Sequence, residues 1–270
     1  MGDNMKASLI QLQMKEYESS AELKKRVFAM IDKCRGADLI VLPELWPLGM
    51  ISYRTLAEHA EPIDGPLMSA ISAKAREVGA YIHCGTFAER DGDKIYNTSL
   101  LFDRNGTDIA SYRKIHLFSW YGREAESFSH GEKPVVVSTE FGRVGLATCY
   151  DLRFPELFRI MSWGMGAEIF IVPSAWSTPR VEMLCTLCSA RAIENFAYLL
   201  ACDITGPYKG LTMRGESRIV SPWGERVTDE MEGEGIVTGN VSSEEVRRIR
   251  YECPGLSDVR LLSSAVKKYK

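Results

Sequence analysis

Apolar and polar residues alternate along the chain with two different periods. Apolar residues spaced three to four positions apart predict helices over 19–36, 65–80, 154–167 and 179–197. Short apolar runs bounded by turn residues predict strands, which we expect over 6–13, 37–44, 80–87, 95–103, 108–114, 135–149 (two strands), 168–175, 198–204, 216–222 and 234–241. Several of these runs are almost continuously apolar, which is typical of strands covered on both faces.

The order of these segments predicts a mixed α/β domain. Runs of strands separated by paired helices are expected to form two sheets packed together, with helices outside. No Gly-, Ser- or Pro-rich linker and no internal repeat interrupts the sequence. We therefore expect one domain over residues 5–245, followed by a charged C-terminal tail over 246–270.

Composition and charge narrow the class of protein. Of the 270 residues, 45% are hydrophobic and 26% are charged, a balance that allows a sizeable core and argues against global disorder. The formal net charge of −3 gives no reason to expect a nucleic-acid or membrane partner, because both usually bind basic faces. No apolar run approaches the roughly 18 residues of a membrane span, and the N-terminal segment lacks the pattern of a secretory signal. We expect a cytoplasmic protein.

The seven cysteines suit a reducing compartment. Cys185 and Cys188 have the spacing of half a zinc site, but no second such pair and no nearby pair of histidines completes it. The sequence also contains no phosphate-binding glycine motif and no serine-hydrolase elbow. We therefore expect no metal and no organic cofactor.

Three residues with chemically active side chains stand at the ends of predicted strands. Glu44 ends a buried apolar run, Lys114 ends the segment 108–114, and Cys149 ends the segment 135–149. Because strand ends gather at one edge of a fold, an acid, an amine and a thiol placed there can share one cleft. Taken singly, each residue has a structural explanation, as a solvated acid, an edge-strand lysine or a buried thiol.

Together, the three groups are sufficient for acyl transfer. A thiol is mostly protonated at neutral pH and needs a base or a cation to become a good nucleophile. Glu44 can accept the proton of Cys149 if burial raises the pKa of its carboxyl group. Lys114 can hold the negative charge that develops on a carbonyl oxygen, and the backbone N–H of Tyr150 is a natural second donor.

The segments that contain these residues, LPELW, YRKIHLF and CYDLRFPE, resemble in order and distance the three signature segments of the nitrilase superfamily of carbon–nitrogen hydrolases. The resemblance covers almost the whole chain and implies a four-layer α-β-β-α sandwich. It also implies that Glu44 is the general base, Lys114 the oxyanion-stabilising lysine and Cys149 the nucleophile. A further glutamate of the family corresponds to Glu124, with Glu126 as the competing position, and is expected to orient Lys114 or the substrate amide nitrogen.

Residues near the candidate nucleophile are expected around the substrate. The segment VPSAWS resembles the substrate-side loop of the family, so Trp176 and Tyr150 are expected either to line the pocket or simply to pack. Arg153 is expected either to bind a substrate carboxylate or to pair internally with Asp151 or Glu156.

The resemblance implies hydrolysis of a non-peptide carbon–nitrogen bond. The CYDLRFPE segment resembles the amidase branches, which include the ω-amidases and the amidases of deaminated glutathione. We predict an amidase that releases ammonia from a small carboxylate-bearing amide through a thioester, with N-carbamoyl hydrolysis and nitrile hydrolysis as alternatives. A non-catalytic scaffold that retains the fold is the alternative from another class. The family assembles through helices that flank the nucleophile, so 155–166 and 185–196 are candidates for the interface of a homodimer or higher homo-oligomer.

Overall fold

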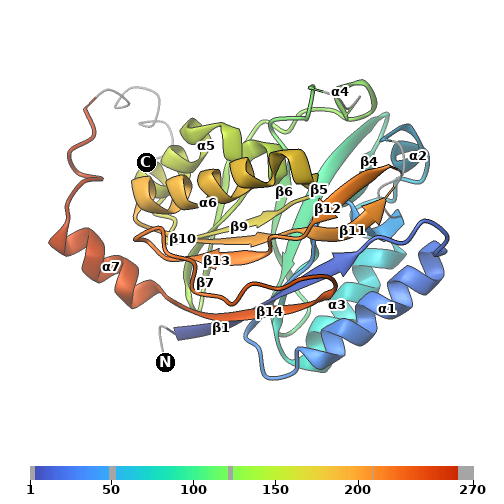
Figure 1. The fold of residues 1–270 in the computed structure, drawn as a ribbon, viewed down its shortest axis with the longest axis horizontal. Coiled ribbons are helices and arrows are strands. Elements are labelled where there is room, and N and C mark those ends of the chain that lie inside the picture. The colour runs from blue at the N-terminus through green and yellow to red at the C-terminus, as the bar shows by residue number, and fades with distance from the viewer. Residues whose placement is uncertain (1–3, 49–52, 121–123, 209, 261–270) are drawn as a thin grey trace.

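Two β-sheets packed face to face form the centre of the protein (Figure 1). The computed structural model describes residues 4–48, 53–120, 124–208 and 210–260. Within these residues the larger sheet has nine strands, in the order β12 (Leu211–Arg214), β11 (Ile204–Tyr208), β1 (Asn4–Gln13), β2 (Leu39–Val41), β3 (Tyr81–His83), β5 (Lys94–Phe102) and β4 (Phe87–Asp91), with β14 (Gly235–Ser242) on β1 and β6 (Asp108–Arg113) on β5. The smaller sheet has the order β13 (Arg218–Val220), β10 (Tyr198–Cys202), β9 (Ile169–Pro173), β8 (Gly142–Leu146) and β7 (Val135–Thr139).

Helices cover the outer face of each sheet. α1 (Ser20–Lys33) and α3 (Pro66–Val78) pack on the larger sheet. α5 (Pro155–Arg159) and α6 (Val181–Asn195) pack on the smaller one, on the opposite side of the molecule in Figure 1. The resulting four layers confirm the predicted α-β-β-α sandwich.

Side-chain alternation along β1 shows how the sequence specifies these layers. Ala7 and Leu9 point toward the smaller sheet and join the core between the sheets. Ile10 and Leu12 point the other way and join the core beneath α1 and α3. Because successive side chains of a strand face opposite sides, a continuously apolar strand is buried on both faces.

The remaining helices are short or peripheral. They are α2 (Tyr53–Glu58), α4 (Glu124–Ser127) and α7 (Ser243–Glu252). α7 begins before the expected end of the domain at residue 245 and continues beyond it, and its Val246 and Ile249 are buried. No helix within the described residues combines the length and apolar character needed to cross a membrane.

Some predicted segments are divided in the structure. The run 80–87 is interrupted after β3 by Gly85, where a Cβ atom would lie 2.0 Å from the Pro43 carbonyl oxygen. The run 198–204 is divided at Asp203, so that β10 belongs to the smaller sheet and β11 to the larger one. The predicted helix over 154–167 is α5 followed by one π-helical turn, Ile160–Gly164.

Candidate active site

The three chemically active strand ends meet inside the protein. Glu44 follows β2, Lys114 follows β6 and Cys149 follows β8; they expose only 4%, 1% and 9% of their surface. Lys114 Nζ lies 2.8 Å from Glu44 Oε1, although the residues are 70 positions apart in the chain. The Cys149 thiol lies beside the Glu44 carboxylate and the Ala175 backbone N–H, and both groups affect the pKa of the thiol. An acid, an amine and a thiol thus share one buried site.

Two of the turns that carry these groups have strained backbones. Cys149 has φ 47° and Leu45, next to Glu44, also has φ 47°. This left-handed region is unfavourable for residues other than glycine and costs about 1–3 kcal/mol where the surroundings enforce it. At Leu45 the backbone N–H donates to Thr86 Oγ1 at 2.9 Å. At Cys149 a 3₁₀ turn, Cys149–Arg153, begins two residues beyond the end of β8. The unusual backbone conformation therefore falls at Cys149 itself and directly after Glu44.

Glu124 lies on the far side of Lys114 from Glu44. Its two carboxylate oxygens lie 3.1 and 2.9 Å from Lys114 Nζ, and Oε2 also accepts the Phe118 N–H at 2.6 Å. Glu124 is fully buried, whereas the competing Glu126 lies at the wall of the open pocket described below. The geometry therefore favours Glu124 as the residue that orients the lysine.

Asn97 joins the two carboxylates and was not expected from the sequence. Its Nδ2 donates to Glu44 Oε1 at 3.0 Å and to Glu124 Oε1 at 2.8 Å. Asn97 is fully buried in the middle of the apolar strand β5. A buried polar residue inside an apolar run is the signal in the sequence that points to such a role.

Burial and mutual charge shift the pKa values of this cluster. Burial raises the pKa of Glu44, and the neighbouring Glu124 adds to that rise against the opposing effect of Lys114. Burial also raises the pKa of the Cys149 thiol well above its usual value, and the nearby Glu44 charge raises it further. For Lys114, burial lowers the pKa, but Glu124 and Glu44 outweigh it, so the ammonium persists well above its ordinary range. The resting site therefore holds a protonated thiol beside a carboxylate with enhanced affinity for protons.

Asp151 ties the turn after β8 to the segment after β6. Its Oδ2 accepts the Thr148 N–H at 2.8 Å and the Tyr112 hydroxyl at 2.7 Å. Its Oδ1 accepts the His116 N–H at 3.1 Å and lies 2.7 Å from His116 Nδ1. The carboxylate is completely buried, so these contacts replace its hydration. Asp151 therefore fixes the position of the thiol-bearing turn relative to Lys114.

A large pocket opens onto the buried cluster. Its volume is about 1150 Å³, and Glu44, Lys114 and Cys149 form its floor together with side chains from both sheets' loops. The expected residues Tyr150, Trp176 and Arg153 all contribute to its wall. Its other lining residues are Leu45, Tyr53, Arg54, Leu56, Phe118, Trp120, Glu126, Ser127, Ala175, Ser177, Pro179, Arg180, Met183, Leu211 and Met213.

Arg153 lies among aromatic rings in this wall. Its guanidinium carbon is 5.7 Å from the Trp120 ring centre, 5.8 Å from that of Tyr150 and 5.3 Å from that of Trp176. Within the described part of the chain, Nη2 contacts the Met183 sulfur at 3.2 Å and the buried Nε has no hydrogen-bond partner. The internal pairing with Asp151 or Glu156 considered above is not observed among the described residues. The guanidinium therefore lines the pocket, and no carboxylate of the described residues is seen to pair with it.

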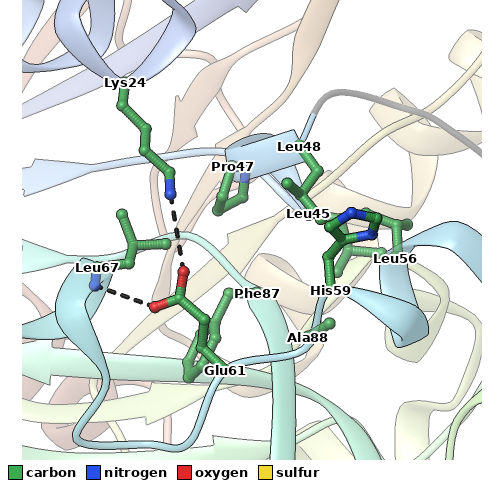
Figure 2. Close-up of a pocket in the computed structure, with 10 residues that line it drawn as sticks. All are labelled: Lys24, Leu45, Pro47, Leu48, Leu56, His59, Glu61, Leu67, Phe87 and Ala88. Atoms are coloured by element: carbon green, nitrogen blue, oxygen red, sulfur yellow. Dashed lines mark hydrogen bonds and ion pairs between the residues drawn. The ribbon is translucent and has the colours of Figure 1, made fainter. Parts of the chain in front are cut away.

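A second and much smaller hollow shares the lining residues Leu45 and Leu56 with this pocket. It holds about 20 Å³, enough for about one water molecule, and the ion pair between Lys24 and Glu61 lies beside it (Figure 2). His59 on its wall has its Nδ1 2.9 Å from the Thr55 carbonyl oxygen. This hollow is too small for an organic substrate.

The fold and this buried acid–amine–thiol site together define a class. The family model described as carbon–nitrogen hydrolase matches residues 6–251. The chain belongs to this carbon–nitrogen hydrolase family.

Individual relatives are similar over most of their length. The chain is 33% identical to the 2-oxoglutaramate amidase of Paenarthrobacter nicotinovorans, covering 91% of this chain and 87% of the relative. It is 35% identical to the deaminated glutathione amidase of Yersinia enterocolitica, covering 86% and 85%. Among solved structures, Saccharomyces cerevisiae Nit3, a member of the nitrilase superfamily, superimposes with a TM-score of 0.84 at 30% identity, over 93% of this chain and 94% of that one.

Proposed function

We propose that the protein is an amidase that releases ammonia from a small carboxylate-bearing amide, with Cys149 as nucleophile. The observation that carries the proposal is the contact of the Cys149 thiol with Glu44, which in turn contacts Lys114, at the floor of a pocket. The relatives named as amidases support the reaction class.

The first half of the reaction forms a thioester. The Cys149 sulfur attacks the amide carbonyl carbon while its proton passes to Glu44, and the carbonyl oxygen becomes negative. The Lys114 ammonium and the Tyr150 backbone N–H stabilise this oxygen; loss of one such donor typically costs about 3–4 kcal/mol of barrier. When the carbon–nitrogen bond breaks, Glu44 returns the proton to the leaving nitrogen, and ammonia departs.

The second half releases the acid. Glu44 removes a proton from water, the resulting hydroxide attacks the thioester carbonyl, and the carbon–sulfur bond breaks. The sulfur then takes the proton from Glu44, which restores the starting state. In this scheme Glu124 and Asn97 keep Lys114 and Glu44 in place, and no step requires a metal or an organic cofactor.

The position of Arg153 supports the proposal that the substrate carries a carboxylate. Its donors face the pocket, and the rings of Tyr150 and Trp176 hold the guanidinium without neutralising it. Arginine is well suited to bind a carboxylate through two parallel hydrogen bonds. N-carbamoyl compounds and nitriles are the alternative substrates, and an ammonia-release screen across the three classes separates them.

The alanine variant of the nucleophile tests the mechanism. Cys149→Ala is expected to abolish ammonia release with little change in the free energy of unfolding, whereas Cys185→Ala, on α6 outside the pocket, keeps the activity. Mass spectrometry after acid quenching is expected to find the acyl group on Cys149. A Cys149→Ala protein that retains near-normal turnover would refute the assignment.

The alkylation pattern of the cysteines distinguishes an amidase from a scaffold without catalytic activity. In an amidase, iodoacetamide labels Cys149 preferentially and substrate protects it, even though Cys253 is the more exposed thiol. A scaffold shows labelling that follows exposure alone.

We also propose that the protein is a homodimer in the cytoplasm. The exposed apolar side chains Met183 and Ile193 on α6 support an interface at the helices that flank the nucleophile. All seven cysteines are free thiols, as suits a reducing compartment. Sedimentation of Ile193→Arg against the unaltered protein tests the interface, since a buried charge there is expected to yield monomers.

A further inference from the structure

Asp203 is a buried acid that the proposed mechanism does not use. It stands between β10 and β11, where the chain passes from one sheet to the other, and it has no exposed surface. Its Oδ1 accepts the Trp176 N–H at 3.0 Å, while Oδ2 hydrogen-bonds none of the described residues. Its backbone N–H donates to Ser217 Oγ at 2.9 Å. Such a buried acid with an unsatisfied oxygen is costly and calls for a physical reason.

The loop that Asp203 holds reaches the nucleophile. Directly after β9, the Ser174 N–H donates to the Cys202 carbonyl oxygen at 2.8 Å, and two residues later the Trp176 N–H donates to Asp203. The N–H between these two, that of Ala175, lies beside the Cys149 sulfur and lowers the pKa of the thiol. The peptide groups on either side of Ala175 share its Cα atom, so fixing the Trp176 peptide restricts the direction of the Ala175 N–H.

The surroundings of Asp203 make its charge sensitive to pH. Burial raises the pKa of its carboxyl group to about 7, against the opposing effect of the Trp176 N–H and of the Ile204 and Glu216 N–H groups, which lie near the carboxyl group without forming a regular hydrogen bond to it. The Glu44 charge, on the loop after β2, adds to the rise. Among the described residues, the thiols of Cys188 on α6 and Cys202 on β10 also interact with its charge.

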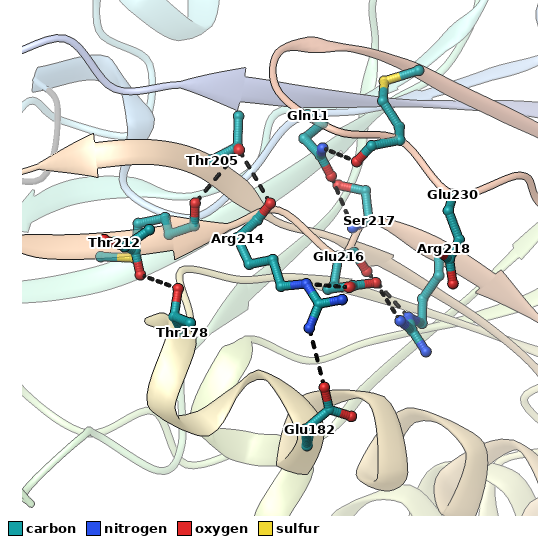
Figure 3. Close-up of polar contacts among 12 residues, drawn as sticks. Gln11, Thr178, Glu182, Thr205, Thr212, Arg214, Glu216, Ser217, Arg218 and Glu230 are labelled. Carbon is teal, nitrogen blue, oxygen red and sulfur yellow. Dashed lines mark hydrogen bonds and ion pairs between the residues drawn. The ribbon is translucent and has the colours of Figure 1, made fainter.

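The nearby Glu216 does not supply a free charge. Its carboxylate lies 2.5 Å from Arg218 and 3.2 Å from Arg214 (Figure 3), and it also lies 3.1 Å from Arg226. Figure 3 also shows that Ser217, which receives the Asp203 N–H, is itself held by Gln11 of β1. Three arginines therefore pair with Glu216, whereas no described arginine or lysine forms an ion pair with Asp203.

We propose that Asp203 is a positioning residue for Cys149, acting through the Trp176 and Ala175 peptides, and that gain or loss of its proton changes the reactivity of the thiol. An ionised carboxylate accepts the Trp176 N–H more strongly than a neutral acid does, so the loop is held more firmly when Asp203 is charged. The inference rests on the proposed role of Cys149 as nucleophile.

The test measures the thiol itself rather than the amidase reaction. The rate at which iodoacetamide alkylates Cys149 is followed by peptide mass spectrometry from pH 5.5 to 8.5 in the unaltered protein, Asp203→Asn and Asp203→Ala. Asp203→Asn keeps an oxygen for the Trp176 N–H but cannot ionise, whereas Asp203→Ala loses the acceptor. Asp38→Asn, at the opposite end of β2 from Glu44, is the control for loss of one acidic charge.

The proposal predicts two results. The ratio of the alkylation rate of the unaltered protein to that of Asp203→Asn rises severalfold with increasing pH, with a midpoint near the pKa of about 7. Asp203→Ala is roughly 2- to 12-fold slower than Asp203→Asn, as expected for loss of one hydrogen bond between neutral groups. A ratio that stays flat overturns the proposal even if Asp203→Ala does not fold, and equal rates for the two variants also overturn it. Because no amide is hydrolysed in this assay, failure of the proposed amidase activity gives a separate result.

Discussion

Replacement of Glu124 by glutamine tests the electrostatic design of the site. Among the described residues, the groups that hydrogen-bond this carboxylate are Lys114 Nζ at 2.9 and 3.1 Å, the Phe118 N–H at 2.6 Å and Asn97 Nδ2 at 2.8 Å, and each of them is a donor. A glutamine has one oxygen and one NH₂ group, so in either orientation the NH₂ group faces a donor. Glu124→Gln therefore removes a charge and also places two donors against each other.

The magnitude follows from these contacts. Glu124 provides two of the three carboxylate contacts of Lys114, and a hydrogen bond between charged groups is worth about 1.5–3 kcal/mol. Each 1.36 kcal/mol lost from the transition state reduces the rate tenfold, so kcat/KM is expected to fall about 10- to 100-fold. The free energy of unfolding is expected to fall by about 3 kcal/mol, because buried donors are left unsatisfied.

The direction in which the pH profile moves distinguishes loss of the Glu124 charge from a general loss of structure. Glu124 raises the pKa of Glu44, so removing its charge lowers that pKa. A base with a lower pKa stays deprotonated to lower pH, and the acid limb of the kcat/KM profile is therefore expected to move to lower pH.

Steady-state ammonia release from pH 5 to 9, on protein whose fold is verified by circular dichroism, measures both effects. Glu126→Gln, two residues along the same short helix but at the pocket wall, is the matched comparison and is expected to lose less than about tenfold. The reasoning is refuted if Glu124→Gln keeps the normal rate and an unmoved acid limb, or if Glu126→Gln shows the larger loss.

Three further predictions follow from the same geometry. Asn97→Leu removes donors from Glu44 and Glu124 and should lower the free energy of unfolding by about 3 kcal/mol in urea titrations; an unchanged midpoint contradicts its bridging role. Arg153→Met should raise KM for a carboxylate-bearing amide roughly 10- to 100-fold, with little change for a neutral amide of equal size; equal changes contradict carboxylate binding. The pKa of Asp203 in the folded protein is about 7, above its unfolded value, so ionisation of Asp203 destabilises the fold as pH rises. Between pH 4 and 8 the free energy of unfolding of the unaltered protein should fall by up to about 4 kcal/mol relative to that of Asp203→Asn, and a difference that does not change with pH contradicts this.

The sequence was sufficient for the parts of the fold and site that depend on local pattern. Continuous apolar runs such as 37–44 predict strands buried on both faces, and the structure confirms this for β2. The order of Glu44, Lys114 and Cys149 at strand ends led to the family, and the structure brings the three side chains together. These features are predictable because each depends on a few neighbouring residues.

Features that depend on pairing between distant segments were not predictable. Asn97 reaches Glu44 and Glu124 only because β5 lies beside β6 in one particular register. β12 was not expected, since three of its four residues are exposed and give it no apolar pattern. The apolar run 198–204 predicts a single strand, because nothing in the sequence shows that the chain passes from one sheet to the other at Asp203.

Charge conservation explains why these particular groups are buried together. With the Cys149 thiol neutral, Glu44 and Glu124 contribute two negative charges and Lys114 one positive charge, so the cluster carries a net charge of −1. In the proposed attack, the thiol proton neutralises Glu44 while a negative charge appears on the carbonyl oxygen, and the net charge of the site stays at −1. Creating a new charge in a buried site is expensive, whereas moving an existing one beside a fixed ammonium is not. Lys114, 2.8 Å from Glu44 in the resting state, is thus placed to stabilise the negative charge both before and after it moves.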